Sequence, residues 1–351
     1  MDENEKMLQP TQANLPESEE LDFFMSIYDL IQQARRGMER AINTTMTVTY
    51  YEIGRRIIEK EQQGKKRAQY GKRILQGLSD YLTKNIGKGY SVENLKLMRR
   101  FYTVYSEAAF GQSPITQFSP NISWTHYIQL MRIVNEDERR FYELEIADNG
   151  WTVKEFQRQF DTSLYERLAL SRDKEKVREL SEKGQIVETP QDLLRDPYVL
   201  EFTGLPEQSS YTETEFEQKL IDHLQKFLIE LGKGFGYMGR QVRFTFEEES
   251  FYVDLVMYNR LLRCFVLIDL KIGRLKHVDI GQMQTYVNYY DRKVKMPDEN
   301  PTIGIVLCKD KKSALVEMML PEENNQIFAG RYQTVLPSKE ELKKALEMAG
   351  E

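Results

Sequence analysis

The chain contains few of the residues that form disulfides or bind soft metals. Its 351 residues include two cysteines and three histidines. Cys264 and Cys308 stand in strand-like runs, where small core residues are expected, and so few cysteines indicate a reducing cytoplasm. His126, His223 and His277 are scattered along the sequence, so a zinc site would lack ligands. These absences argue against disulfide-stabilised scaffolds and zinc enzymes.

Long apolar segments and nucleotide-binding loops are also missing. No run of about 18 apolar residues occurs, so neither a membrane span nor a membrane partner is expected. No G-x-x-x-x-G-K-[ST] loop is present, which argues against an ATP motor. Residues 1–20 are acidic and polar without an apolar core, and they predict a disordered leader instead of a secretory signal.

The net charge of −6 argues against a nucleic-acid partner, because phosphate binding is driven by positive charge. The average hides a local bias, since residues 55–73 carry eight basic and two acidic side chains. A carboxylate cluster that binds magnesium would also make part of a nuclease acidic. The charge balance therefore leaves a nucleic-acid partner open.

Two strand-like runs in the second half of the chain carry the strongest signal. Residues 251–258 and 264–271 flank a short polar and basic link, which predicts a β-hairpin. Each run places one acid, Asp254 or Asp269, among apolar residues, where an uncompensated charge is costly. A charge in such a position needs a partner or a function.

The expected hairpin register brings these acids together. Pairing Tyr258 with Phe265 also places Asp254 opposite Asp269, and the period of two puts Lys271 on the same face as Asp269. Two carboxylates and an ammonium on one patch suit Mg²⁺ and a lysine beside an attacking water. A buried Asp–Lys pair can equally be an ordinary ion pair, and the D…D-x-K spacing is degenerate.

The flanking elements favour the metal site. Residues 213–231 predict an amphipathic helix with Glu217 in its first turn, where an acid also suits the helix dipole. A strand at 237–246 precedes the hairpin, and a helix from Asp279 and a buried strand at 302–308 follow it. The order is helix, three strands, helix, strand.

That order, with the acids and lysine in these places, resembles the PD-(D/E)xK nuclease superfamily. The resemblance extends to the YhcG-type nuclease family, in which a helical N-terminal domain precedes the nuclease domain. The likeness covers nearly the whole chain beyond residue 20, and IDLKIG followed by GQM is its most specific part. The matching stretches are 89–92, 150–153, 196–202, 239–241, 252–255, 268–273 and 281–283.

The resemblance implies a role for each residue of the site. Asp254 and Asp269 would bind Mg²⁺ or Mn²⁺, with the Leu270 carbonyl as a further ligand. Lys271 would orient or activate water and stabilise charge on the phosphate, and Glu217 would complete the acidic site. Such a site suits phosphodiester hydrolysis, because a divalent cation neutralises charge that develops on oxygen.

Three further polar residues are candidates for supporting the site or contacting substrate. Gln282 and Tyr286 are four residues apart on one helix face, and they resemble the QxxxY feature found near such sites. Gln241 lies on the adjoining strand, where a purely structural hydrogen bond is an equal alternative.

The first half of the chain is expected to be helical, with a helix-turn-helix or winged-helix-like arrangement. Ser91 and Thr152 each follow a glycine and an aromatic residue, and each is placed to cap a helix. In the helix after Ser91, Lys96, Arg99 and Arg100 lie opposite a broad apolar arc. They predict a nucleic-acid-binding face, with a solvated basic face as the alternative.

The sequence thus predicts a multidomain α and α/β protein with a restriction-endonuclease-like mixed sheet. The expected function is a metal-dependent nuclease that hydrolyses phosphodiester bonds in DNA, with a helical DNA-targeting domain. The sequence leaves open whether it is an endonuclease or an exonuclease, and whether it acts in repair or defence. A homodimer fits because a duplex break needs two cuts. A non-catalytic DNA-binding or assembly protein and an RNA-directed nuclease are the alternatives. Deletion up to about residue 172 is expected to leave a folded nuclease domain. The expected parts are a leader (1–20), a helical domain (21–171), a linker (172–210) and a nuclease-like domain (211–351).

Overall fold

A computed structural model describes residues 18–63, 68–106, 118–170, 174–207, 211–310, 318–320, 323–336 and 338–342. The expected leader therefore lies outside the described residues up to residue 17, and residues 18–20 already belong to the first helix. The chain divides into two compact units, Met1–Met131 and Arg132–Glu351, and each is described by itself. Within the described part of the chain, no helix combines the length and the apolar character that crossing a membrane requires.

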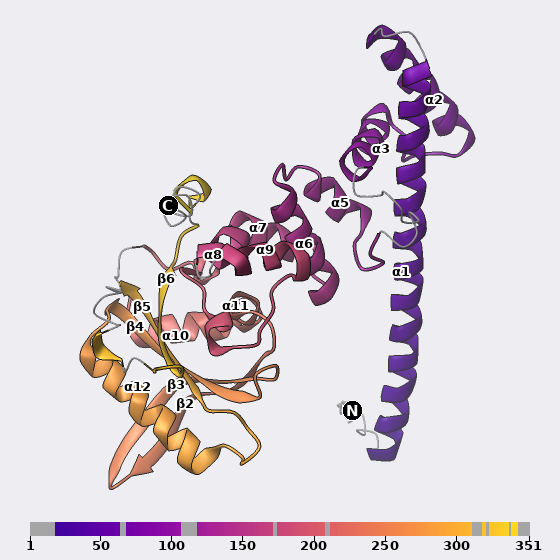
Figure 1. Cartoon of the computed structure of the whole chain (residues 1–351). Coiled ribbons are helices and arrows are strands. Elements are labelled where there is room, and N and C mark those ends of the chain that lie inside the picture. Colours follow the sequence, from indigo (N-terminus) through magenta and orange to yellow (C-terminus); the bar gives the residue numbers. More distant parts are fainter. Residues whose placement is uncertain are drawn as a thin grey trace, which may run out of the picture. The chain divides into compact units, whose positions relative to one another are not determined.

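The described residues of the first unit form helices, as expected for the N-terminal region (Figure 1). The second half of the longest helix packs closely against α3. A Cβ atom on Gly54 of α1 would lie 2.1 Å from the carbonyl oxygen of Met98, so only glycine permits this approach. The helices are α1 (Ser18–Gln63), α2 (Ala68–Asn85), α3 (Val92–Tyr105) and α5 (Trp124–Leu130).

The second unit begins with four helices, one of which starts at a predicted cap. Thr152 and Glu155 form a reciprocal capping box at the start of α7, and Gly150 ends α6 with φ 62°. Ser91 likewise caps α3 by accepting from the Asn94 N–H. Both predicted caps are confirmed. The four helices are α6 (Glu136–Asn149), α7 (Val153–Asp161), α8 (Leu164–Leu170) and α9 (Lys174–Lys183).

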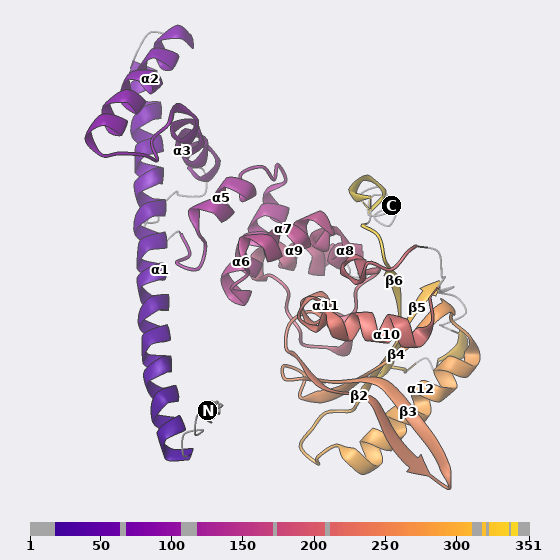
Figure 2. The ribbon, with the colours of Figure 1, turned by 180° about the vertical axis from the view of Figure 1, so that it is seen from behind.

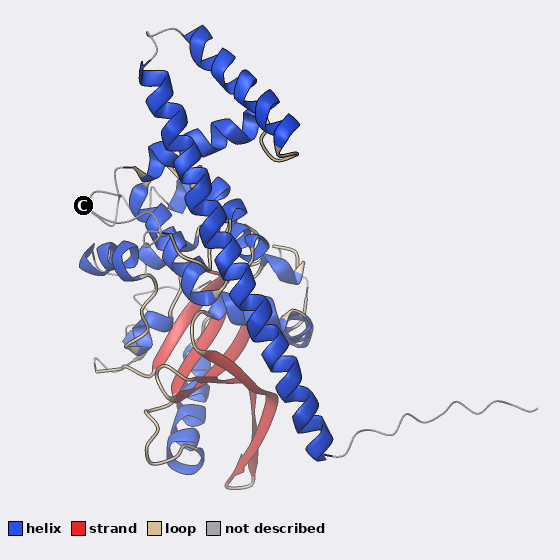
Figure 3. Ribbon diagram, turned by 90° about the vertical axis from the view of Figure 1, so that its right-hand side faces the viewer, coloured by secondary structure: helices blue, strands red, loops and turns tan. Residues whose placement is uncertain are grey.

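A six-stranded mixed sheet follows in the order β1-β6-β5-β4-β3-β2, drawn in red in Figure 3. β2, β3 and β4 form an antiparallel meander, whereas β4, β5, β6 and β1 run parallel to one another. The predicted mixed sheet is therefore confirmed, and part of the segment expected as a linker forms edge strand β1. The strands are β1 (Tyr198–Val199), β2 (Phe235–Phe246), β3 (Glu249–Asn259), β4 (Cys264–Arg274), β5 (Ile303–Asp310) and β6 (Ile327–Gln333).

Helices cover both faces of the sheet (Figure 2). α10 (Glu213–Asp222) and α11 (Leu224–Leu231) pack on one face, and α12 (His277–Tyr289) packs on the other. The prediction of a single helix over 213–231 was wrong in one respect. His223 leaves the helical region, with φ −120° and ψ 33°, and divides it into α10 and α11.

Buried ion pairs explain why the chain divides near residue 132, ahead of the boundary expected near residue 172. Glu230 of α11 is fully buried, and its carboxylate lies 2.5 Å from Arg167 of α8 and 3.5 Å from Arg158 of α7. Arg158 also pairs with Glu201 at 2.8 Å. These charges are costly to separate once they are removed from water. Helices α6–α9 therefore belong with the sheet.

Candidate active site

The predicted hairpin register is confirmed. Tyr258 of β3 lies opposite Phe265 of β4, and the ladder continues to Leu255 opposite Ile268. Asp254 and Asp269 come next in this series, at the point where the ladder between the two strands ends. The hairpin thus brings both acids to one end of the β3–β4 ladder.

The backbone of β3 turns at Asp254. Val253 packs in the core beneath α12, whereas Leu255 packs in the core beneath α10 and α11. Strict alternation would place residues two apart on the same face. The change of face occurs at Asp254, whose Oδ2 atom accepts a hydrogen bond from the Leu270 N–H at 2.8 Å. Asp254 is therefore fixed to β4 beside Asp269.

Gln241 links two of the acids. It is one of the non-glycine residues with a left-handed backbone, with φ 45°, a conformation that costs on the order of 1–3 kcal/mol. Its Nε2 atom donates to Glu217 Oε2 at 2.6 Å and to Asp254 Oδ1 at 3.0 Å. The side chain thereby holds the acid of α10 close to the acid of β3.

Asp269 and Lys271 share a face of β4, as the period of two predicted. The Lys271 ammonium lies 2.8 Å from Asp269 Oδ2, and the Asp269 side chain is 2 % exposed. Burial raises the pKa of Asp269 to about 7, against the attraction of Lys271 and with added repulsion from Asp254. For Lys271, burial acts to lower the pKa, but attraction to Asp269 outweighs it and the pKa is raised.

Glu217 is the third acid, and it is buried at 5 % exposure. Burial raises its pKa, the hydrogen bond from Gln241 opposes that rise, and the negative charge of Asp254 adds to it. Arg240 lies 3.7 Å from the carboxylate and donates to Gln218 at 2.8 Å. Sequence reasoning missed Arg240, although it stands beside Gln241 in the 239–241 motif.

The QxxxY pair ties α12 to the site. Gln282 donates a hydrogen bond to the Tyr286 hydroxyl, which donates to the Tyr252 carbonyl of β3 at 2.7 Å. Burial raises the pKa of Tyr286, and the charges of Asp269 and Asp254 contribute to the rise. These contacts support a positioning role for the pair, because they link the helix to the strand that carries Asp254.

The donor set fits a divalent cation in its chemistry. Three carboxylates and the Leu270 carbonyl offer the hard oxygen ligands that Mg²⁺ and Mn²⁺ prefer. The raised pKa of Asp269 indicates that its negative charge is incompletely compensated. Gln241, Lys271 and a backbone N–H engage the acids, and no three acidic, histidine or cysteine side chains of the described residues converge in a metal-binding geometry. A cation shared by these acids would therefore require them to rearrange.

The basic residues predicted as a nucleic-acid face have partners within the first unit. Lys96 pairs with Glu93 at 2.7 Å, and Arg99 pairs with Glu61 at 2.9 Å. Arg100 donates to the carbonyl at the end of α5, that of Met131, at 2.7 Å. Their binding to nucleic acid stays a prediction, and two of them also connect elements of the unit.

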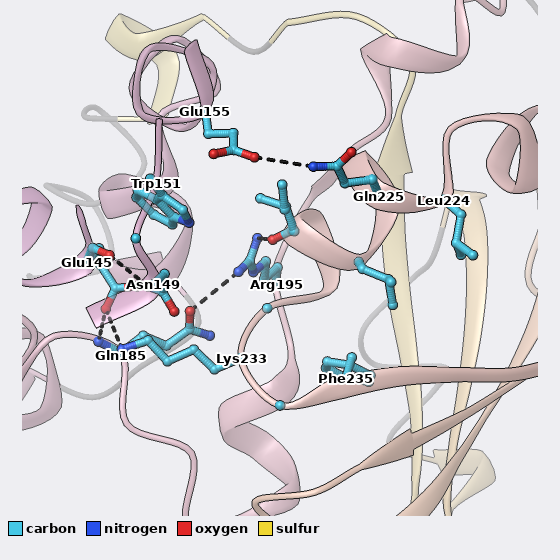
Figure 4. A pocket seen from close by; sticks show the side chains of 15 residues that line it. Glu145, Asn149, Trp151, Glu155, Gln185, Arg195, Leu224, Gln225, Lys233 and Phe235 are labelled. Atoms are coloured by element: carbon cyan, nitrogen blue, oxygen red, sulfur yellow. Dashed lines mark hydrogen bonds and ion pairs between the residues drawn. The ribbon is translucent and has the colours of Figure 1, made fainter. Parts of the chain in front are cut away.

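A cavity of about 570 Å³ lies elsewhere in the second unit, between α6, α7 and α11 (Figure 4). Arg195 and Gln185 line it, and they lie beside the glycine-rich turn after α11. None of Glu217, Asp254 and Asp269 is among its lining residues. The cavity is therefore distinct from the acidic cluster.

Comparison with known proteins identifies the family. Residues 191–347 match the model of the YhcG PDDEXK nuclease domain, and residues 26–167 match the DUF1016 N-terminal domain. The chain is 37 % identical over 341 residues to "Putative nuclease YhcG" of Escherichia coli (strain K12), with 90 % of each chain covered. The chain belongs to the YhcG family. The resemblance predicted from the sequence motifs is confirmed.

A solved structure of a repair endonuclease from Pyrococcus abyssi is a weaker match. It is 16 % identical, with a TM-score of 0.25, and the match covers 36 % of this chain and 50 % of that chain. A similarity of this size supports no conclusion about function. The restriction-endonuclease-like fold rests on the family match and on the order of the elements.

Proposed function

We propose that the chain is a metal-dependent nuclease that hydrolyses phosphodiester bonds in DNA, with its helical N-terminal region engaging the substrate. One observation carries the proposal. Glu217 from α10, Asp254 from β3, and Asp269 with Lys271 from β4 gather at the end of the β3–β4 ladder. Gathering carboxylates away from water is energetically costly. A bound cation would compensate their negative charge.

Each residue has a role in this proposal. Glu217, Asp254, Asp269 and the Leu270 carbonyl would hold Mg²⁺ or Mn²⁺, which when bound neutralises charge on the phosphate oxygens. Lys271 keeps its proton, because its pKa is raised, and its ammonium orients water and stabilises negative charge on the phosphate.

Two further side chains extend the proposed site. Gln241 positions Glu217 and Asp254, since it donates to both carboxylates. Arg240 has a side chain that is 44 % exposed and lies beside Glu217, where it offers a cation to the substrate backbone. This contact would help to offset the repulsion between the acidic cluster and the phosphates.

A second candidate is a non-catalytic DNA-binding or assembly protein. The favouring observation is that Asp254 and Asp269 already have protein partners, in Gln241, the Leu270 N–H and Lys271. Such a network would be stable without a metal. In the first candidate the acids bind a cation. In the second they only stabilise the fold.

The test is a substrate panel of duplex DNA, single-stranded DNA and RNA with Mg²⁺, Mn²⁺ or EDTA. The wild-type chain should cleave DNA with a divalent cation and lose that activity in EDTA. Lys271→Ala and Asp269→Asn should lose cleavage while keeping their fold by circular dichroism. Lys219→Ala, an exposed change on the helix that carries Glu217, is the matched control and should cleave normally.

The other outcomes separate the alternatives. Binding without cleavage under all metal conditions would favour the non-catalytic candidate, and preferential cleavage of RNA would favour the RNA-directed nuclease. Undiminished cleavage by both variants would place the activity outside this acidic cluster.

A further inference from the structure

The first half of α1 presents a row of large apolar side chains to solvent. α1 has 46 residues, which corresponds to about 69 Å at 1.5 Å per residue. Its second half carries buried residues such as Tyr51 and Ile57, at 4 % and 3 % exposure. In residues 21–42, ten large apolar residues are 42–62 % exposed, and six of them form the row: Leu21, Phe24, Tyr28, Ile31, Met38 and Ile42. An exposed apolar surface of this length marks an interface.

The spacing of these residues is that of a coiled coil. The steps from Leu21 to Ile42 alternate between three and four residues when Arg35 is included, and Thr45 continues the series. Hydrophobic residues that repeat in this way every 3.5 residues form the seam along which helices supercoil. The row therefore has the spacing of a coiled-coil seam, and Phe23, Met25, Ile27 and Leu30 are exposed beside it.

The seam is complementary to itself in the antiparallel direction. Positions a and d alternate along it, and antiparallel helices pair a with d. A symmetric pair centred on Gln33 places Phe24 of one copy opposite Ile42 of the other, and Tyr28 opposite Met38. The polar seam residue Arg35 then lies opposite Ile31, next to the centre.

The charges favour the same direction. Residues 19–34 contain four acidic and no basic side chains, whereas residues 35–42 contain three basic and one acidic. In the antiparallel pair centred on Gln33, the basic segment 35–42 of one copy lies along residues 24–31 of the other, which carry Asp29 and no basic side chain. A parallel pair would lay acid beside acid and base beside base, which is unfavourable.

From this complementarity we infer that the exposed half of α1 is a dimerisation helix, whose occupant is the same segment of a second copy in antiparallel orientation. The interface is isologous, because each copy contributes the same seam. The inference does not depend on the proposed nuclease activity. If both hold, each assembly carries two acidic clusters, one in each chain.

The oligomeric state of the full chain tests the interface. Light scattering after size exclusion should give the mass of a dimer at micromolar concentration. Ile31→Glu with Met38→Glu places charge in the seam and should weaken association at least tenfold. Ser26→Glu with Gln33→Glu adds the same charge on the exposed opposite side of α1 and should leave the dimer intact. A monomeric wild type, or equal weakening by both pairs, would overturn the inference.

Cysteine crosslinking tests the orientation. The chain's two cysteines, Cys264 and Cys308, are buried, so the background is low. A mixture of Phe24→Cys chains with Ile42→Cys chains should form a mixed disulfide under mild oxidation. Phe24→Cys alone should not crosslink to itself, because the antiparallel pair holds these positions far apart. Self-crosslinking of Phe24→Cys would show a parallel pair and contradict the proposal.

Discussion

Protonation of Asp269 is governed by burial and by its neighbours. The pKa of its carboxyl is raised from 3.8 to about 7 by burial, with Lys271 opposing the rise and Asp254 adding to it. The native state therefore binds more protons than the unfolded state between about pH 4 and pH 7. The stability that this group contributes is fully present below pH 4 and is lost as the pH rises through 7.

We predict that Asp269→Asn removes this part of the pH dependence. In EDTA, the free energy of unfolding of the variant relative to wild type should increase from pH 5 to pH 8. Urea unfolding at pH 5, 6, 7 and 8 measures the difference. A difference that does not change with pH would show that Asp269 does not titrate in this range.

Gln241 combines a strained backbone with two charged hydrogen bonds. Gln241→Ala should lower the free energy of unfolding by about 1–3 kcal/mol, because the buried Glu217 carboxylate and the half-buried Asp254 carboxylate lose a donor. Gln241→Gly removes the same bonds but relieves the left-handed backbone, at φ 45°, and should recover about 1 kcal/mol of stability. Denaturant unfolding of the two variants in EDTA separates the two effects. Equal stabilities would argue that the backbone is unstrained.

At the scale of elements, the turn between α11 and β2 depends on glycine. Gly232 ends α11 with φ 113°, and a Cβ atom there would lie 3.0 Å from Arg195 and 3.1 Å from Gln185. The positive φ makes the position unfavourable for other residues whatever the space available. The glycine-rich stretch is thus explained by helix termination.

We predict that Gly232→Ala lowers the free energy of unfolding by about 1–3 kcal/mol. Gly281→Ala is the matched control, because this helical glycine of α12 has open space around its Cβ position. The control should be neutral or stabilising by up to about 1 kcal/mol. Thermal unfolding of both variants gives the comparison, and an unaffected Gly232→Ala would contradict it.

The basic face of α3 can be tested as a unit. Alanine at Lys96, Arg99 and Arg100 should weaken nucleic-acid binding across sequences. It should also reduce the slope of log affinity against log salt by about one for each phosphate that the face no longer binds. Because Arg99 and Arg100 connect α3 to other elements, whereas Lys96 pairs with Glu93 within α3, Lys96→Ala alone is the cleaner variant. Fluorescence titrations at several salt concentrations measure affinity and slope, and unchanged values would favour a solvated face.

At the scale of the whole molecule, the ion network around Glu230 determines which truncated chains are expected to fold. Deletion up to residue 172 would remove Arg158 and Arg167, two of the cations paired with the Glu230 carboxylate. Arg195, 3.5 Å away, would be the cation that is left. Leaving a buried charge uncompensated costs several kcal/mol. The ion network argues against the expectation that the nuclease domain folds after that cut, which stays a prediction.

We predict that residues 132–351 fold alone and that residues 172–351 do not. Circular dichroism and cooperative urea unfolding of the two fragments provide the measurement. The shorter fragment should lack a cooperative transition or be less stable by about 3–5 kcal/mol. A cooperative transition of equal stability in both fragments would show that α6–α8 are dispensable to the sheet.

Local patterns in the sequence were enough to predict several features of the fold and of the acidic cluster. The hairpin register, the pairing of Asp269 with Lys271, the caps at Ser91 and Thr152 and the mixed sheet follow from alternation, spacing and turn chemistry over a few residues. Such signals act between near neighbours, where the geometry of strand and helix fixes which side chains share a face.

Features that depend on distant partners could be seen only in the folded chain. The break at His223, the turn of β3 at Asp254, the left-handed Gln241 and the buried ion network around Glu230 arise from packing between elements far apart in the sequence. The exposed half of α1 is another such feature. An apolar helix face can be seen to lack a partner only when the fold shows which residues cover it.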